Sequence, residues 1–192
     1  MAVLLILAPF GAFTLLMLVT TATVSLFISA AICLAVIALD AARGRSLKIL
    51  STGSAIVFGG IGSYLVFIDP ALSGSAVKIA VDGGVLVITL GSMLFRYPFT
   101  LQYALEEVPA ETAAIPGFLR ANYVITGAWA GAAVLMIAGN LAMIYVPGLP
   151  LWTGLAIAFA ARNSALYFTR WYPEYRKAKD ARPQAGALTE TR

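Results

Sequence analysis

Two charged residues lie inside an apolar segment that is long enough to cross a membrane. Residues 76–95 contain Lys78 and Asp82, and a transmembrane helix needs about 20 apolar residues. The two residues are four apart, so they share one face of a helix. Arg162 and Asn163 lie inside the last apolar segment of the chain. Because charged groups are costly in hydrocarbon and usually face a partner or a polar cavity, we expect these four residues to form an intramembrane polar cluster.

Two interpretations of this cluster stay open. In the structural one, Asp82 neutralises a cation and holds neighbouring helices together. In the functional one, Lys78, Asp82 and Arg162 line a path for an ion, a proton or an anionic substrate. Counted from the outer face, the depths of Asp82 and Arg162 differ by about 7 Å, which an arginine side chain can bridge. Two basic residues and one acidic residue leave a net positive site, which suits an anion or a lipid headgroup.

The residue types that most enzymes need are scarce. The chain has no histidine and a single cysteine, Cys33, which excludes Ser-His and Cys-His catalysis and histidine metal sites. It also lacks a phosphate-binding glycine loop, a zinc-ligand spacing and a nucleophile elbow. Glu106, Glu107 and Glu111 are most simply a solvated rim on a surface helix. We therefore predict a protein without enzymatic activity, metal or cofactor.

The composition defines the fold class. Sixty per cent of the 192 residues are hydrophobic and 11% are charged, whereas about 25% are charged in a typical soluble domain. We predict an all-α, polytopic integral membrane helix bundle over residues 1–170, with a disordered cytoplasmic tail at 171–192. Six hydrophobic segments are expected, and a version with five spans and a partly inserted first segment is the alternative. Their predicted bounds are 3–19, 22–39, 49–68, 76–95, 122–146 and 151–169.

The basic residues predict the orientation. Apart from Lys78 and Arg162, every lysine and arginine falls in alternate loops or in the tail, and the connections 69–75 and 147–150 have none. This positive-inside pattern places the C-terminus in the cytoplasm, so the net charge of +4 does not indicate nucleic-acid binding. Between the fourth and fifth spans, residues 99–107 have an amphipathic pattern, which predicts a short helix on the cytoplasmic surface.

Several residues are candidates for helix packing. Gly59 and Ser63 are four apart, a spacing of small residues that favours close approach of two helices, and Gly60 adds a further small residue. Trp129 lies well inside its span and is expected to be a packing anchor. Asn140 is expected to hydrogen-bond a neighbouring helix or an outer turn.

The order of short motifs resembles one family. These motifs are Val57-Phe58-Gly59-Gly60, Lys78 at the start of the next span, Arg96-Tyr97-Pro98, Trp129-Ala130, and Asn140 followed by Tyr145. In this order the chain resembles the bacterial intracellular septation protein A family over most of residues 22–145. One departure is Thr126, where the family has asparagine. The resemblance implies a multi-pass protein of the bacterial inner membrane that acts in septation and envelope maintenance through protein contacts, without catalytic residues.

Two functions are therefore expected to compete. The first is a septation-type protein that contacts inner-membrane or division proteins through its cytoplasmic loop, with Arg96, Pro98, Glu106 and Glu107 as contact residues. The second is a small transporter or channel with a polar path along the intramembrane cluster. A sheltered cavity reaching Asp82 favours the transporter, and a dry, directly paired Asp82 favours the scaffold. The lipid bilayer is the expected partner in both cases, and a second copy of the chain is a further candidate.

Overall fold

The structure is a computed structural model that describes residues 2–150 and 152–189. Over these residues it is helical, without strands, which confirms the all-α prediction. Four helices, α2, α3, α4 and α7, are long and apolar enough to cross a membrane. The helix predicted at 99–107 is present as α5 with the same bounds. The elements are α1 (Ala2–Leu16), α2 (Ala22–Ala42), α3 (Ile49–Phe67), α4 (Gly74–Leu94), α5 (Phe99–Glu107), α6 (Ala110–Ala113), α7 (Pro116–Tyr145) and α8 (Trp152–Thr189).

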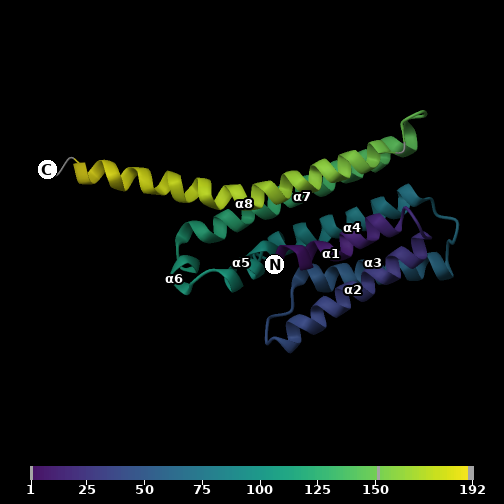
Figure 1. Cartoon of the computed structure of the whole chain (residues 1–192), viewed down its shortest axis with the longest axis horizontal. Helices are drawn as coiled ribbons and strands as arrows, with labels where there is room; N and C mark the ends of the chain where they lie inside the picture. Colours follow the sequence, from purple (N-terminus) through teal and green to yellow (C-terminus); the bar gives the residue numbers. More distant parts are fainter. Residues whose placement is uncertain (1, 151, 190–192) are drawn as a thin grey trace.

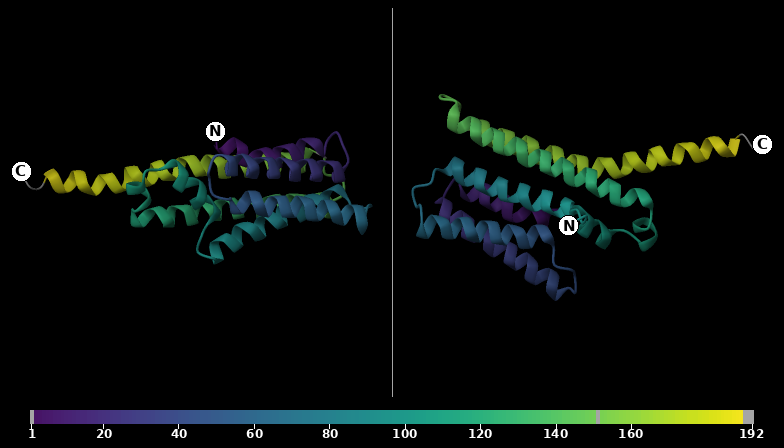
Figure 2. Two further views of the ribbon diagram at one scale, coloured as in Figure 1. Left: turned by 90° about the horizontal axis from the view of Figure 1, so that it is seen from below. Right: turned by 180° about the vertical axis from the view of Figure 1, so that it is seen from behind.

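The long helices run back and forth between two ends of an elongated bundle (Figure 1). α7 and α8 lie side by side along one side, α2 and α3 lie along the other, and α1 and α4 lie between them (Figures 1 and 2). The short helices α5 and α6 and the turn at 43–48 share one end, which we call the α5 end. The turns at 17–21, 68–73 and 146–150 share the opposite end. The C-terminal part of α8 projects beyond the α5 end.

Two hydrophobic clusters hold the bundle together. The first is centred on Phe58 of α3, which is fully buried, and the rings of Phe10 and Phe13 of α1 lie 5.5 Å from its ring. The second joins α7 and α8 and consists mostly of alanines, whose small side chains let two helices approach closely. Trp129 packs against both clusters. It therefore lies where a packing anchor was expected.

The glycines that let helices approach closely differ from the predicted ones. A Cβ atom added at Gly59 or Gly60 would meet nothing within 4 Å, so neither glycine makes a close helix contact. At Gly84 of α4, by contrast, an added Cβ atom would lie 2.7 Å from the Val57 methyl groups of α3. The packing prediction for Gly59 and Gly60 is wrong for the described residues, because no neighbouring helix approaches either glycine. Ser63 is half-buried.

The predicted end of the last helix also needs correction. The sequence predicted a span ending at Thr169 and a disordered tail, but α8 continues without a break to Thr189. Two aromatic pairs support the continuation as far as Tyr175. Phe168 stacks on Tyr172 and Trp171 stacks on Tyr175, with ring centroids 5.1 and 5.0 Å apart, and both pairs have the i, i+4 spacing that stabilises a helix.

Candidate functional site

Asp82 is buried at the interface of α4 and α7. Its residue is 8% exposed, and its Oδ2 atom accepts a hydrogen bond of 3.1 Å from Nδ2 of Asn140, which is 7% exposed. Asn140 therefore bonds to a neighbouring helix, as expected. The amide donates one hydrogen bond to a carboxylate that can accept several. Asp82 also lines a cavity, from which its carboxylate can accept further hydrogen bonds.

Arg162 of α8 lies close to this carboxylate without pairing with it. Its Nη1 atom donates a 3.4 Å hydrogen bond to Thr14 Oγ1 of α1, and its Nη2 atom lies 3.8 Å from Met136 Sδ of α7. Among the described residues, Arg162 and Asp82 form no ion pair within 4 Å. The positive charge of Arg162 nevertheless acts on the Asp82 carboxylate. The two opposite charges are therefore neighbours but not a closed salt bridge.

The other two members of the predicted cluster lie elsewhere. Asn163 is exposed and donates a 2.8 Å hydrogen bond to the Phe159 carbonyl of its own helix, because one residue along a helix is a rotation of about 100°. Lys78 is half-buried and forms no hydrogen bond or ion pair with the described residues, although its charge also acts weakly on Asp82. The structure therefore brings Asp82, Arg162 and Asn140 together, and not Asn163.

A cavity of about 620 Å³ connects Asp82 and Arg162 with the α5 end. Its walls come mainly from α1, α4, α5, α7 and α8, with single residues from α3 and α6, and they are mostly apolar. At the α5 end its lining includes Glu107, Arg176 and Lys177. Sequence reasoning found the two charges deep in this cavity but missed the cavity itself, because its walls come from helices far apart in the chain.

Some polar side chains also line the cavity, among them Thr100, Asn122 and Thr169. The Thr100 hydroxyl of α5 lies 2.8 Å from the Thr126 hydroxyl of α7 and donates a 3.0 Å hydrogen bond to the Asn122 carbonyl. The indole of Trp129 donates a 3.0 Å hydrogen bond to Thr169 Oγ1 of α8. The sequence signal for these pairs was weak because isolated threonines are common in membrane helices.

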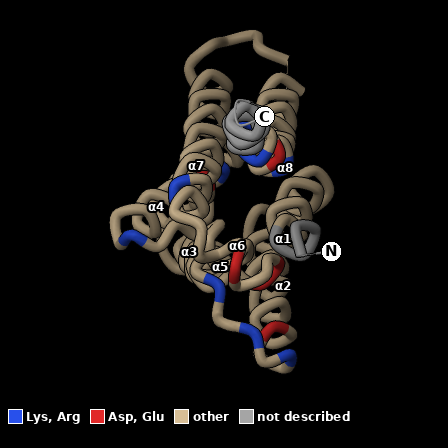
Figure 3. The backbone as a smooth tube through the Cα atoms, turned by 90° about the vertical axis from the view of Figure 1, so that its left-hand side faces the viewer, with Lys and Arg blue, Asp and Glu red and all other residues tan. Residues whose placement is uncertain are grey.

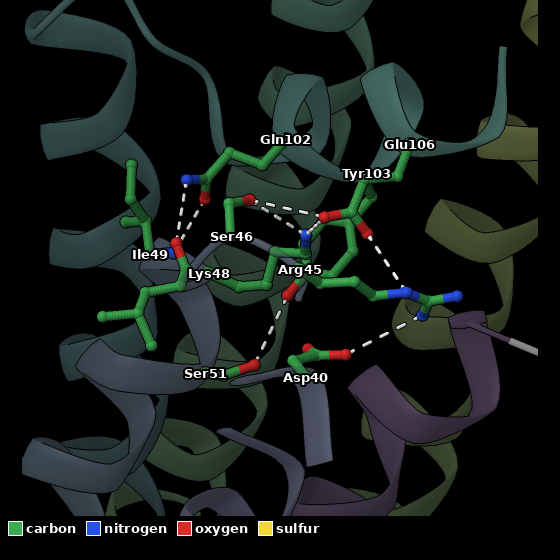
Figure 4. Close-up of polar contacts among 10 residues, drawn as sticks. Asp40, Arg45, Ser46, Lys48, Ile49, Ser51, Gln102, Tyr103 and Glu106 are labelled. Atoms are coloured by element: carbon green, nitrogen blue, oxygen red, sulfur yellow. Dashed lines mark hydrogen bonds and ion pairs between the residues drawn. The ribbon is translucent and has the colours of Figure 1, made fainter. Parts of the chain in front are cut away.

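Helix α5 forms one wall of the cavity. Hydrogen bonds and an ion pair connect it to the α2–α3 turn (Figure 4). Gln102 accepts a 2.7 Å hydrogen bond from the Ile49 backbone N–H and donates one of 3.2 Å to the Leu47 carbonyl. Lys48, only 2% exposed, forms an ion pair with Glu106. Gln102 is itself buried, because its side-chain amide satisfies these backbone groups.

The Lys48–Glu106 ion pair is the centre of a small charged network. Arg45 Nε lies 3.9 Å from the Glu106 carboxylate, and Arg45 Nη1 lies 3.8 Å from Asp40. Burial raises the pKa of Glu106, but the hydrogen bond from Lys48 and the charges of Lys48 and Arg45 outweigh it, so the pKa of Glu106 lies below its ordinary value. Burial raises the pKa of the neighbouring Tyr103 to about 12, so its hydroxyl is neutral at physiological pH.

The predicted contact residues of the cytoplasmic loop have different roles. Glu106 is used inside the molecule. Pro98 is fully buried, and Arg96 has a left-handed backbone conformation (φ 59°) in the sharp turn from α4 into α5. Glu107 is exposed at the cavity. Of the four residues, Pro98 is therefore the buried one, and Glu106 is exposed but already paired with Lys48.

Comparison with known proteins adds no family to this description. No family model matches the chain, and neither a curated protein nor a solved structure matches it. The fold and site define a helical protein with several apolar helices of membrane-spanning length. The resemblance to the septation family stays a prediction.

Proposed function

We propose that this chain is a small transporter for an anionic solute, and that the cavity at Asp82 and Arg162 is its binding site. One observation carries the proposal. A cavity reaches Asp82, and the opposite charge of Arg162 lines the same cavity without closing a salt bridge. A pair that served only to hold helices together would be expected to be dry and directly bonded. Substrate sites of transporters commonly lie near the middle of the membrane.

In the proposed arrangement six hydrophobic segments cross the bacterial inner membrane, with α1 and α8 added to the four long apolar helices. The α5 end faces the cytoplasm. Figure 3 looks onto this end, where lysines and arginines mark the turns, as the positive-inside rule requires. The cavity then extends from the cytoplasmic side to the middle of the membrane.

The two charges have different roles in this proposal. Arg162 binds the anion, because its guanidinium is a strong donor for carboxylates and phosphates. Asp82 is held in place by Asn140 and is the counter-charge that receives Arg162 when the anion leaves. A site without Asp82 still binds the anion but releases it slowly.

Flux through proteoliposomes tests the proposal. Purified protein is reconstituted, and uptake of labelled phosphate, acetate and dodecanoate is compared with that of protein-free liposomes. We expect uptake of at least one anion by the wild type, a loss of tenfold or more in Arg162→Gln, and a similar loss in Asp82→Asn with binding retained. Asn163→Ala is the matched control, since it changes the adjacent residue on the exposed face, and it should transport normally. Absence of uptake by the wild type, or normal uptake by Arg162→Gln, would refute the proposal.

The septation function is retained as a prediction but gains no observation in its favour. Its contact surface was expected at the loop between α4 and α7. In the structure Glu106 forms an ion pair with Lys48 and Pro98 is buried.

A further inference from the structure

We propose that the solute is a single-chain amphiphile, with one anionic head at Arg162 and a hydrocarbon chain along the cavity towards the α5 end. This inference rests on the proposed function and names the chemical class of its ligand. Its first support is the chemistry of the walls. Between the charged residues the lining is mostly apolar, and it includes Phe10, Val85, Phe118, Ile125, Trp129 and Leu166. A hydrated inorganic anion would lose water against such walls without gaining a partner, whereas a hydrocarbon chain is stabilised there.

The second support is the length of the cavity. Arg162 at its deep end and Arg176 at its α5 end lie on the same helix. They are fourteen positions apart, which corresponds to about 21 Å at the rise of an α-helix. One leaflet contributes about half of a hydrocarbon core that is about 30 Å thick, so an acyl chain of ordinary length fits lengthwise. The volume of about 620 Å³ lies within the range of about 300–1,000 Å³ that holds one small ligand.

The third support is charge. Arg162 lines the cavity as a cation and forms no ion pair with the Asp82 carboxylate. Arg162 has five N–H donors, and it donates to the Thr14 hydroxyl and the Met136 sulfur. An anionic head that accepts from the guanidinium in a bidentate manner supplies the partner that this half-buried cation needs. The charge favours an acid over an alcohol or an amine, and the cavity size favours one chain over two.

Trp129 offers a direct readout because it lines the cavity and its indole is held by Thr169. We replace Trp152 and Trp171 by phenylalanine, so that only Trp129 fluoresces, and place the protein in phosphatidylcholine nanodiscs. The probe is dodecanoate brominated at mid-chain, since bromine quenches tryptophan on contact. A chain that keeps only Trp152, which is 66% exposed on the bundle surface, reports the probe dissolved in the bilayer.

We expect quenching of Trp129 to saturate with added probe and quenching of Trp152 to rise in proportion to it. Arg162→Gln should raise the half-saturating concentration at Trp129 by tenfold or more, Arg162→Lys by less, and Asn163→Ala not at all. Size-exclusion chromatography of each variant shows whether it is folded. If Arg162→Gln is not folded, the binding measurement on Arg162→Lys tests the proposal.

Three results would overturn the inference. These are unsaturable quenching at Trp129, equal half-saturation by the matching brominated alcohol, and preferred quenching by phosphatidylglycerol with brominated chains, which would assign the site to a two-chain lipid. The failure of the inference is distinguishable from failure of the proposed function. If phosphate or acetate is transported and the brominated acid does not bind, the transporter function is retained and the amphiphile is rejected as its solute.

Discussion

The ion pair between Lys48 and Glu106 predicts an asymmetric response to mutation. The Lys48 side chain is 2% exposed, whereas that of Glu106 is 27% exposed. Glu106→Gln leaves a buried ammonium group without a carboxylate. Lys48→Met, by contrast, leaves a carboxylate that water and Arg45 can still stabilise. We therefore expect the loss of the more exposed partner to be the more damaging change.

The magnitude follows from the burial of the two groups. Removing one partner of a fully buried ion pair costs about 3–5 kcal/mol. Because Glu106 is partly solvated and glutamine keeps a hydrogen-bond acceptor, we expect a loss of about 2 kcal/mol for Glu106→Gln. For a chain of this size that loss lowers Tm by about 4–8 °C. Lys48→Met should stay within about 1 kcal/mol of the wild type, since methionine fills the space of the buried lysine stem.

The wild type, the two single variants and the double variant form a double-mutant cycle. Their thermal unfolding is measured in one detergent by tryptophan fluorescence. The double variant Lys48→Met/Glu106→Gln should be more stable than Glu106→Gln alone, because it has no unpaired buried charge. If Lys48→Met is the less stable single variant, or if the double variant is the least stable of the four, the assignment of the buried charge to Lys48 is wrong.

Three further predictions concern the same scaffold. The pKa of Glu106 is lowered in the folded protein, so its contribution to stability is present above its ordinary pKa of about 4.3. That contribution should disappear as the pH falls below this value, and thermal unfolding at pH 3 to 7 should show no such loss in Glu106→Gln. Gly84→Ala should cost about 1–3 kcal/mol because its Cβ would overlap an α3 side chain, whereas Gly83→Ala, with open space, should stabilise the helix by about 0.5–1 kcal/mol; unfolding midpoints of the pair check this. Asn140→Leu should lower the free energy of unfolding by about 1–3 kcal/mol, because it leaves the buried Asp82 without its hydrogen-bond donor. Asp82→Asn should lower it by less than about 1 kcal/mol. If the same unfolding assay finds Asp82→Asn to be the less stable variant, this prediction is wrong.

Much of the fold could be predicted because the positions of the helices depend on local sequence patterns. Apolar runs of membrane-spanning length located the long helices to within a few residues, except that α7 begins six residues earlier and α8 extends much further. Pro98 and Pro109 marked the limits of α5. The packing faces could not be predicted, because several glycines were available in α3. Only the neighbouring helix decides which of them matters, and Gly59 and Gly60 turned out to face open space.

The candidate site was predictable in its charges and not in its shape. Asp82 and Arg162 attracted attention because each is costly in an apolar segment, and the structure places both at one cavity. Asn163 was grouped with them only because it adjoins Arg162, although a helix turns adjacent side chains apart. The bond between Asn140 and Asp82 and the fastening of α5 by Gln102 join residues more than fifty positions apart. No local pattern in the sequence encodes such pairs.

The separation of Lys48 and Glu106 also has a consequence for biosynthesis. The two residues are 58 positions apart, and α3 and α4 lie between them. At a translation rate of about 5–20 residues per second, Lys48 leaves the ribosome roughly 3–12 seconds before Glu106. During that interval its ammonium group is hydrated and, in the proposed orientation, strengthens the positive charge that retains the α2–α3 turn in the cytoplasm. In that proposed orientation the same lysine first directs insertion, and it pairs with Glu106 only when α5 has been delivered.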